Sequence, residues 1–433
     1  MLKHHLKSIL TCVYVLISFT VISGQNYISY LTGDTADVSV NPQGGTCLVG
    51  GAGESDDAMK WFLQRADGGD VLVLRASGSD GYNPYFYSQL GVTINSVETI
   101  VFNNALAAND SYVQQRVAEA EAIWFAGGNQ WNYVSYWRNT AIDSLINDGL
   151  QNRNIVIGGT SAGMAILGDY YFSAQNGSVT STTALNNPFT SNVTVDSMDF
   201  LNVDFLENVV TDTHYDDPDR KGRHMVFLAR MLHDYDVDAR GIACDEYTAV
   251  CIDENGIAHA FGEYPQYDDN VYFLQVNCEN INPTPETLVN GQPLDWNLGG
   301  KAVKVYTIKG KTDGSNTFNL NTWESGTGGE WKNWYVTNGT LNESVSTQMN
   351  CSVNANPIDM SNQIKISPNP VSDFLAIETD ISDIEKIQIF DVNGQLVKTT
   401  SKLNIDISDL KKGSYIVEIQ SGEKVGIVLF LKI

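Results

Sequence analysis

The sequence Gly158-Gly159-Thr160-Ser161-Ala162-Gly163 contains the pattern G-x-S-x-G, directly after the apolar run 155–157 and before the helix-like stretch 164–167. In this context a serine stands on a tight strand-to-helix turn that exposes its hydroxyl. The N–H of the next residue, Ala162, can donate to a developing oxyanion, and the helix dipole favours the negative charge. The pattern predicts Ser161 as a nucleophile. The alternative is that the glycine-rich turn binds phosphate or serves packing alone.

A serine hydroxyl needs a base to remove its proton, and histidine is the usual base. After the first 24 residues the chain contains four histidines: His214, His224, His233 and His259. His224 and His233 fall on a predicted amphipathic helix, and His259 falls on a predicted edge strand. His214 follows the apolar pair Val209-Val210 where a strand ends, and sites on parallel sheets gather at such ends. His214 is therefore the predicted general base.

A third group must orient this imidazole. The candidates are six carboxylates: Asp212, Asp216, Asp217, Asp219, Asp245 and Glu246. Asp245 and Glu246 lie between the apolar runs 241–243 and 249–252, so the edge of a sheet could hold either one rigidly, whereas the others could be solvated. These patterns leave the choice open.

The second donor to the oxyanion is expected from another glycine-rich turn. Ala126-Gly127-Gly128-Asn129-Gln130 follows the apolar run 123–125. Its two glycines permit conformations that direct N–H groups into a site. Gly50-Gly51-Ala52-Gly53 is a similar but weaker candidate.

These residues need a scaffold, and short apolar runs alternate with helix-like stretches from Cys47 to Ile252. Such alternation is typical of an α/β protein with a parallel sheet and crossover helices. Strands are predicted at 46–49, 70–74, 99–102, 122–125, 154–157, 241–243 and 249–252. Helices are predicted at 55–65, 111–121, 136–147 and 222–234.

The composition changes after Asn255. The segment 255–350 is rich in Gly, Asn, Thr and aromatic residues, with strand-like runs at 270–276 and 301–308 that are predicted to complete or edge the sheet. Residues 352–363 are short, polar and proline-containing, as in a linker. Alternating runs separated by turn residues then predict a small all-β sandwich over 364–433. We therefore predict a catalytic domain over 25–351.

The chain has 433 residues, with 26 basic and 51 acidic side chains, and a net charge of −25. This negative surface disfavours nucleic acid as a partner. Residues 1–24 combine Lys3 and Lys7 with the apolar run 9–22, which predicts a secretory signal peptide. That run is shorter than the roughly 20 residues of a membrane-spanning helix.

Five cysteines follow this segment: Cys47, Cys244, Cys251, Cys278 and Cys351. An exported chain can form disulfides, but an odd number cannot all pair, and the sequence does not decide the pairing. No two cysteines have C-x-x-C spacing, and no histidine stands at zinc-ligand spacing from them. We predict no metal site and no cofactor.

The C-terminal segments SPNPVSDFLAIE, IFDVNGQLVK and LKKGSYIVEI resemble the sorting domain of the type IX secretion system of Bacteroidota. The likeness covers about the last 70 residues and departs from the usual basic ending at Phe430–Ile433. It implies that the domain addresses the protein to the outer membrane. The secretion machinery is therefore an expected partner, and the cell surface or the medium is the expected location.

The upstream segments resemble the cyanophycinase and aspartyl dipeptidase family of serine peptidases. The segments that carry the likeness are Gly50–Ala52, Phe125–Gln130, Gly158–Gly163, Asp212–Tyr215, Arg220–Arg223 and Cys244–Val250. The resemblance implies a flavodoxin-like, class I glutaminase-like fold with helices on both faces of the sheet. It also implies a triad of Ser161, His214 and Glu246, with oxyanion donors from Gly128 and Ala162.

The same resemblance implies an exopeptidase that hydrolyses aspartyl amide bonds. Cyanophycin, a polyaspartate bearing arginine on its side chains, would release β-Asp-Arg dipeptides. The resemblance implies that Arg220 and Arg223 pair with the aspartyl carboxylate, a geometry that suits arginine better than lysine. Gln130 and Asp212 would line the pocket.

Two departures keep other functions open. Thr213 precedes the base where cyanophycinases generally have Gln, and the acidic stretch 216–219 stands where the family is usually more basic. The alternatives are a surface-located binding protein that has lost catalysis, and a dipeptidase or amidohydrolase for another acidic peptide. A homodimer is also open.

Overall fold

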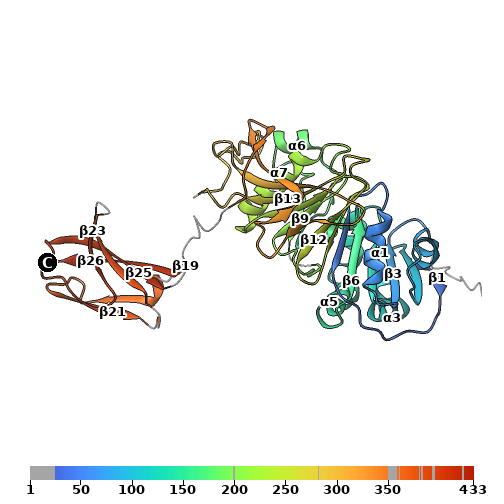
Figure 1. Cartoon of the computed structure of the whole chain (residues 1–433), viewed down its shortest axis with the longest axis horizontal. Helices are drawn as coiled ribbons and strands as arrows, with labels where there is room; N and C mark the ends of the chain where they lie inside the picture. Colours follow the sequence, from blue (N-terminus) through green and yellow to red (C-terminus); the bar gives the residue numbers. More distant parts are fainter. Residues whose placement is uncertain are drawn as a thin grey trace, which may run out of the picture. The chain divides into compact units, whose positions relative to one another are not determined.

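The computed structural model describes residues 25–197, 200–280, 282–349, 358–359, 361–379, 381, 384–392, 395–421 and 424–433. The predicted signal peptide and most of the predicted linker lie outside these ranges. The chain divides into two compact units (Figure 1). One unit comprises Met1–Val276 and Thr284–Gln348, and the other comprises Asn277–Pro283 and Met349–Ile433.

The first unit contains a ten-stranded sheet. In spatial order its strands are β1 (Tyr27–Gly33), β4 (Ser96–Phe102), β3 (Asp70–Arg75), β5 (Ala122–Phe125), β6 (Val156–Thr160), β2 (Thr46–Val49), β11 (Ala249–Ile252), β12 (Ile257–Phe261), β15 (Asn316–Asn319) and β16 (Gly326–Thr327). The run β4-β3-β5-β6-β2 is parallel, and antiparallel strands extend it on both sides. The order β4-β3-β5-β6 matches the start of the 2-1-3-4-5 order of flavodoxin-like sheets. The predicted α/β class is confirmed.

Helices cover both faces of this sheet because successive strand residues point to opposite sides. Leu72 and Leu74 share a core with α3 (Ser111–Glu119), α4 (Gln130–Trp137) and α5 (Ala141–Asn152). Val71 and Val73 share a separate core with α1 (Asp56–Gln64). Smaller elements are α2 (Tyr82–Pro84), η1 (Tyr85–Gln89), η2 (Ala105–Asn109) and η3 (Met164–Ile166).

A second, eight-stranded sheet belongs to the same unit. In spatial order its strands are β18 (Thr340–Val345), β17 (Gly329–Thr337), β14 (Val303–Lys309), β13 (Asn270–Val276), β10 (Arg240–Cys244), β9 (Val209–Asp212), β7 (Tyr170–Phe172) and β8 (Val195–Ser197). Its core includes residues of α6 (Ser181–Asn186) and α7 (Lys221–Tyr235). Strands from the segment 255–350 enter both sheets, so the expectation of a single sheet is wrong.

The helix predicted at 136–147 is interrupted. α4 ends at Trp137, and Asn139 takes a left-handed φ of 59°. The hydroxyl of Thr140 accepts a hydrogen bond from the N–H of Ile142 at 3.1 Å, so a new helix begins there. The apolar spacing continues across the break, which explains why periodicity alone did not reveal it.

The second unit is all-β. A five-stranded sheet contains β19 (Ile358–Asp359), β26 (Lys424–Lys432), β25 (Gly413–Ser421), β22 (Lys386–Asp391) and β23 (Leu396–Thr400). A three-stranded sheet contains β20 (Ile364–Ser367), β21 (Phe374–Thr379) and β24 (Asn404–Asp406), and the short helix η5 (Ser361–Gln363) precedes it. One apolar core includes residues of both sheets, among them Leu375 and Ile389.

Candidate active site

Ser161 stands on a sharp turn directly after β6. Its φ is 51°, a left-handed value that is uncommon for a residue with a side chain. Its N–H donates to the carbonyl of Val49 at 3.0 Å, and its own carbonyl accepts from Ala165 at 2.9 Å. The expected helix after the turn is only the 3₁₀ segment η3, so the macrodipole near Ser161 is that of a single turn.

His214 follows β9 of the other sheet, and its imidazole reaches Ser161. The His214 Nε2 atom lies 2.8 Å from Ser161 Oγ. The His214 N–H donates to the carbonyl of Gly50 at 2.8 Å. The ring also rests against Gly51, whose φ is 119°, and a Cβ atom there would lie 2.4 Å from Nε2. Only glycine fits beneath this imidazole.

Glu246 lies on the connection from β10 to β11, so it links the two sheets. Its Oε1 atom lies 2.5 Å from His214 Nδ1, on the opposite side of the ring from Ser161. The Glu246 N–H donates to Asp216 Oδ1 at 2.9 Å. The side chains of His214 and Glu246 keep 22% and 23% of their surface exposed. The three groups form a chain of two hydrogen bonds that solvent can reach.

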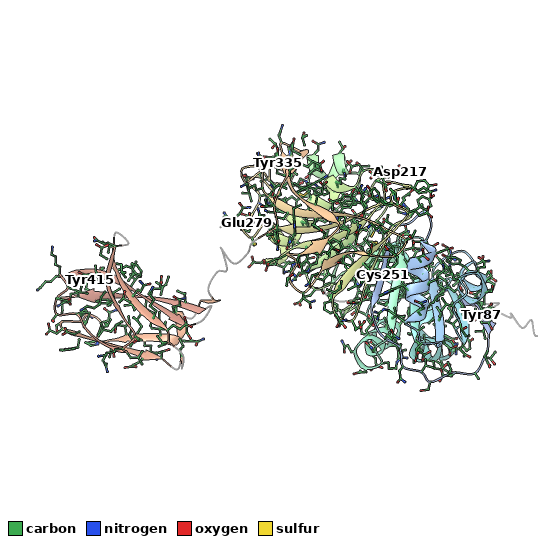
Figure 2. The ribbon with its side chains drawn as sticks, in the orientation of Figure 1. Tyr87, Asp217, Cys251, Glu279, Tyr335 and Tyr415 are labelled. Atoms are coloured by element: carbon green, nitrogen blue, oxygen red, sulfur yellow. The ribbon has the colours of Figure 1, made fainter. Side chains whose placement is uncertain are left out.

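The other carboxylates have different partners. Asp245 is 3% exposed and accepts from the backbone and side chain of Asn270 at 3.1 and 2.9 Å. Burial raises the pKa of Asp245 to about 7. Asp216 accepts from Glu246, while Asp217 and Asp219 are exposed. Figure 2 marks Asp217 at the surface of the first unit. Of the six carboxylates, Glu246 is the one bonded to His214 within the described ranges.

The remaining histidines lie in other surroundings. His224 is fully buried, with Nδ1 at 3.1 Å from the Tyr215 hydroxyl. Burial lowers the pKa of His224 to about 4. His233 pairs with Asp234 at 2.7 Å, and His259 lies 3.7 Å from Asp253.

The predicted oxyanion donors lie on two turns, one of which carries Ser161 itself. Gly127 faces Ser161, because a Cβ atom added at Gly127 would lie 3.7 Å from the Ser161 Cβ. Gly128 follows with φ of 155°, and Ala162 is 3% exposed. In the part of the chain that the structure describes, the N–H groups of Gly128 and Ala162 have no hydrogen-bond acceptor. Neither N–H is therefore committed to another group of the described chain.

The four residues predicted to bind substrate contact other parts of the protein. Arg223 donates from Nε to Asp212 Oδ2 at 2.8 Å and from Nη2 to Asp212 Oδ1, and both side chains are 3% exposed. Burial alone would raise the pKa of Asp212, but the charge and hydrogen bonds of Arg223 lower it. Arg223 Nη1 lies 3.3 Å from Ser178 Oγ and from the Val179 carbonyl. The structure thus places Asp212 and Arg223 in the interior instead of on a pocket wall.

Arg220 and Gln130 lie nearer the surface. Arg220 donates from Nη1 to the carbonyl of Thr213 at 3.0 Å, next to His214, and it is partly exposed. Gln130 donates from Nε2 to the carbonyl of Phe172 at 3.1 Å. Gln130 is two residues from Gly128 in the chain, and Arg220 is bonded to the residue that precedes His214.

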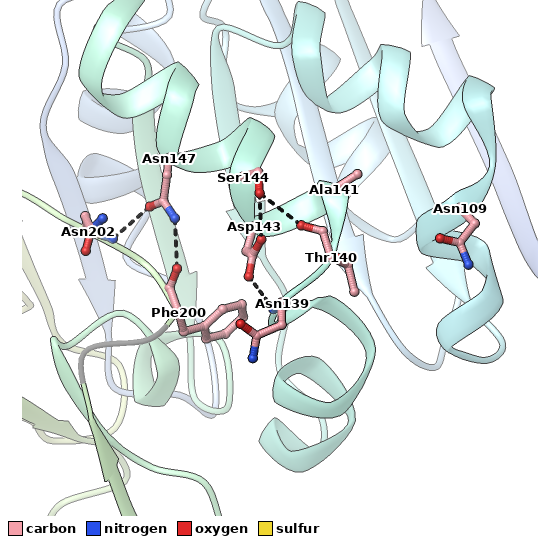
Figure 3. A pocket seen from close by; sticks show the side chains of 9 residues that line it. All are labelled: Asn109, Asn139, Thr140, Ala141, Asp143, Ser144, Asn147, Phe200 and Asn202. Carbon is pink, nitrogen blue, oxygen red and sulfur yellow. Dashed lines mark hydrogen bonds between the residues drawn. The ribbon is translucent and has the colours of Figure 1, made fainter.

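The structure offers other cavities. One of about 700 Å³ lies at the start of α5 and is lined largely by polar side chains such as Asn139, Asp143 and Asn147 (Figure 3). Its described lining contains none of the predicted site residues. Across the described ranges, no group of three or more His, Cys, Asp or Glu side chains could hold a metal ion, and no helix is long and apolar enough to cross a membrane.

Two segments of this chain are similar to known families. Residues 78–259 match peptidase family S51, and residues 365–430 match the secretion system C-terminal sorting domain. No curated protein matches the chain. A peptidase from an acI-B1 Actinobacterium shares 17% identity over 53% of this chain and 90% of its own, with a TM-score of 0.38. A protein assigned as peptidase E from Listeria monocytogenes EGD-e shares 16% identity over 51% of this chain and 99% of its own, with a TM-score of 0.33.

The segment that matches peptidase family S51 includes Ser161, His214 and Glu246, whereas Gly51 precedes it. A family of peptidases implies a peptide substrate. The sorting domain supports type IX secretion to the cell surface or the extracellular space. The chain thus joins a segment similar to S51 peptidases to a segment similar to secretion sorting domains, and the two matches support a secreted peptidase.

Proposed function

We propose that this protein is a serine peptidase in which Ser161 is the nucleophile, His214 the general base and Glu246 the group that orients the base. One observation carries the proposal: His214 lies 2.8 Å from Ser161 Oγ through Nε2 and 2.5 Å from Glu246 Oε1 through Nδ1. A hydroxyl, an imidazole and a carboxylate in this order are the working parts of a catalytic triad, whatever the fold that carries them.

The proposed reaction has two halves. Ser161 Oγ attacks the carbonyl carbon of the scissile amide while its proton moves to His214 Nε2, and Glu246 stabilises the resulting imidazolium at Nδ1. The N–H groups of Gly128 and Ala162 donate to the oxyanion. His214 then gives its proton to the departing amine, which leaves an ester on Ser161. Water, deprotonated by the same imidazole, hydrolyses this ester.

The substrate that we propose is an aspartyl amide, with cyanophycin as the first compound to test. Its arginine side chains carry positive charge. The carboxylates of Asp217 and Asp219 are exposed on the loop that follows His214, so they can attract such cations. Arg220 is the better placed of the two predicted arginines to meet an aspartyl carboxylate, because Arg223 is occupied by Asp212. The chain would act as an exopeptidase that releases β-Asp-Arg.

The decisive test uses Ser161→Ala in the full chain. We expect turnover to fall about 10⁶-fold, because the residual rate comes from the oxyanion donors and binding alone. A serine-directed phosphonate probe should label the wild-type protein and not the variant. Ser191→Ala, which changes an exposed serine, is the matched control and should keep both activity and labelling. Turnover that survives in folded Ser161→Ala would refute the proposed nucleophile.

A non-catalytic binding protein is the second candidate, because Thr213 and the acidic stretch 216–219 next to His214 depart from the cyanophycinase pattern. The same probe separates the two functions. A binding protein would show no covalent labelling at Ser161, while it would still retain an aspartyl peptide on a column. Release of β-Asp-Arg from cyanophycin, compared with cleavage of α-aspartyl peptides, then separates the substrates.

A further inference from the structure

Two cysteine side chains face each other inside the ten-stranded sheet. Cys47 of β2 stands directly opposite Cys251 of β11, which Figure 2 labels within the first unit. Their Sγ atoms lie 3.4 Å apart, and both residues are fully buried. A third buried thiol, Cys244, belongs to β10 of the other sheet and contacts the carbonyl of Leu48 at 3.7 Å.

The register of these strands shows which kind of pair the two cysteines form. The N–H of Gly50 donates to the carbonyl of Thr248 at 3.0 Å, so those directly opposed residues form a hydrogen-bonded pair. Hydrogen-bonded and non-hydrogen-bonded pairs alternate along antiparallel strands. Cys47 lies three residues before Gly50, so by this alternation Cys47 and Cys251 form a non-hydrogen-bonded pair. In such a pair the Cα atoms are about 4.5 Å apart and the side chains approach most closely. A disulfide needs Cα atoms roughly 4.4–6.8 Å apart.

The compartment favours oxidation of this pair. The C-terminal sorting domain supports export, and disulfides persist in exported proteins. Cys278 of the same chain is already disulfide-bonded, so an oxidised state is part of this structure. Cys47 and Cys251 are free thiols in the structure.

We propose that Cys47 and Cys251 form a disulfide in the exported protein. The thiolate of one cysteine attacks the disulfide of a dithiol–disulfide oxidoreductase and forms a mixed disulfide. The second thiolate then displaces the enzyme, which leaves as a dithiol and takes up the two protons. Both sulfur atoms are inaccessible in the folded sheet, so this exchange precedes the closing of β11 onto β2. The bond is a permanent crosslink instead of a switch.

This crosslink joins the strands that support the proposed triad. β2 ends at Val49, and the carbonyls of Val49 and of the next residue, Gly50, accept hydrogen bonds from the N–H groups of Ser161 and His214. β11 begins shortly after Glu246. The two cysteines are 204 positions apart, and crosslinks that close long loops restrict the unfolded chain most. The bond would fix β2, whose end holds Ser161 and His214, against β11, the strand that follows Glu246.

The test is peptide mapping of the full chain, produced through an oxidising export pathway and alkylated with N-ethylmaleimide while denatured and non-reduced. We expect a peptide pair joined through Cys47 and Cys251, which separates on reduction, and we expect Cys244 to carry the alkyl group. Alkylation of both Cys47 and Cys251, or a bond from either to Cys244, would overturn the proposal. This readout does not depend on activity, so it can fail while the proposed function stands.

Variants make the test sharper. Cys251→Ala should leave Cys47 fully alkylated and lower the melting temperature by several degrees. Cys244→Ala, the matched buried control, should keep the crosslinked peptide pair. Loss of the crosslink in Cys244→Ala alone would show that the assignment to Cys47 and Cys251 is wrong.

Discussion

Two histidines of this protein, His214 and His224, each rest against a glycine yet differ in every other contact. A Cβ atom at Gly51 would lie 2.4 Å from His214 Nε2, and one at Gly241 would lie 2.2 Å from His224 Nε2. His214 is partly exposed and bonded to a serine and a carboxylate. His224 is fully buried and bonded to a tyrosine hydroxyl and a carbonyl.

The carboxylates near these histidines explain the difference. Glu246 meets His214 directly and can stabilise its charged form. Asp212 lies near His224, but both of its oxygens are taken by Arg223, so burial dominates and His224 stays neutral near pH 7. A histidine works as a base where a carboxylate and solvent both reach it. In the interior, the same residue only fills space and donates a hydrogen bond.

Between these two histidines, the largest expected effect comes from removing Glu246, the carboxylate bonded to His214. We expect Glu246→Ala to lower kcat about 10⁴-fold, because the imidazole loses the group that fixes its tautomer and stabilises its charge. Hydrolysis rates measured on folded protein check this.

Glu207→Ala is the control for this variant, because it removes the carboxylate of an exposed glutamate at the other end of β9 from His214. Its rate should match that of the wild type. A Glu246→Ala rate within tenfold of the wild type would show that the carboxylate is not part of the mechanism.

Near His224, breaking the ion pair between Asp212 and Arg223 is expected to lower the stability of the protein and not the rate of hydrolysis. Asp212→Asn leaves the buried guanidinium of Arg223 without its partner, and an uncompensated buried charge costs about 3–5 kcal/mol. Urea unfolding at neutral pH measures this loss. Adding Arg223→Met to the same chain should recover part of it, because the double variant removes both charges. Equal stability of Asp212→Asn and the wild type would contradict the assignment of this ion pair.

The sequence was sufficient for many of the strands in the first unit. Seven predicted strands before residue 253 correspond to β2, β3, β4, β5, β6, β10 and β11. Their apolar runs are buried on both faces, so each run marks its strand without help from distant residues. The prediction of Ser161 as a nucleophile rests on G-x-S-x-G, which is a local pattern between a strand and a turn.

Spacing in the sequence did not distinguish the candidate carboxylates, whose partners are visible only in the folded structure. Asp212, Asp245 and Glu246 all follow or adjoin apolar runs, and only the two-sheet arrangement brings Glu246 to His214 and turns Asp212 toward Arg223. The family resemblance named Glu246, while spacing did not. Gly51 was a weak candidate in the sequence because the ring that it supports is far away in the chain.

Substitution of Gly51 is a third way to test the contrast, and its expected effect on the rate is smaller. Gly51→Ala adds a methyl group 2.4 Å from the imidazole nitrogen, on a backbone with φ of 119° that disfavours any side chain. The ring must move, and a displacement of about 1 Å costs about 10²-fold in rate. Gly53→Ala is the matched control, since its methyl group would meet only the exposed ring of Tyr247 at 3.0 Å. A Gly51→Ala enzyme as fast as Gly53→Ala would mean that the imidazole tolerates displacement.

The smallest expected effect is a loss of stability at acidic pH, and it comes from His224. Its pKa falls from the ordinary value of 6.5 to about 4 on folding, because burial disfavours the charged ring. Below pH 6.5 the unfolded chain takes up a proton that the folded chain refuses, so stability falls as pH drops toward 4. Between pH 7 and pH 5 this loss is about 2 kcal/mol.

We expect His224→Gln to lack this component, which urea unfolding at pH 7 and pH 5 measures as a difference from the wild type. Glu121 and Asp245 have pKa values raised to about 7, so they act in the opposite direction and lose stability as pH rises toward 7. Their contribution is common to both chains and cancels in the difference. His233→Gln, at a half-exposed position, should behave like the wild type. If wild type and His224→Gln lost stability in parallel between pH 7 and pH 5, the buried histidine would be charged in the fold, and its contrast with His214 would disappear.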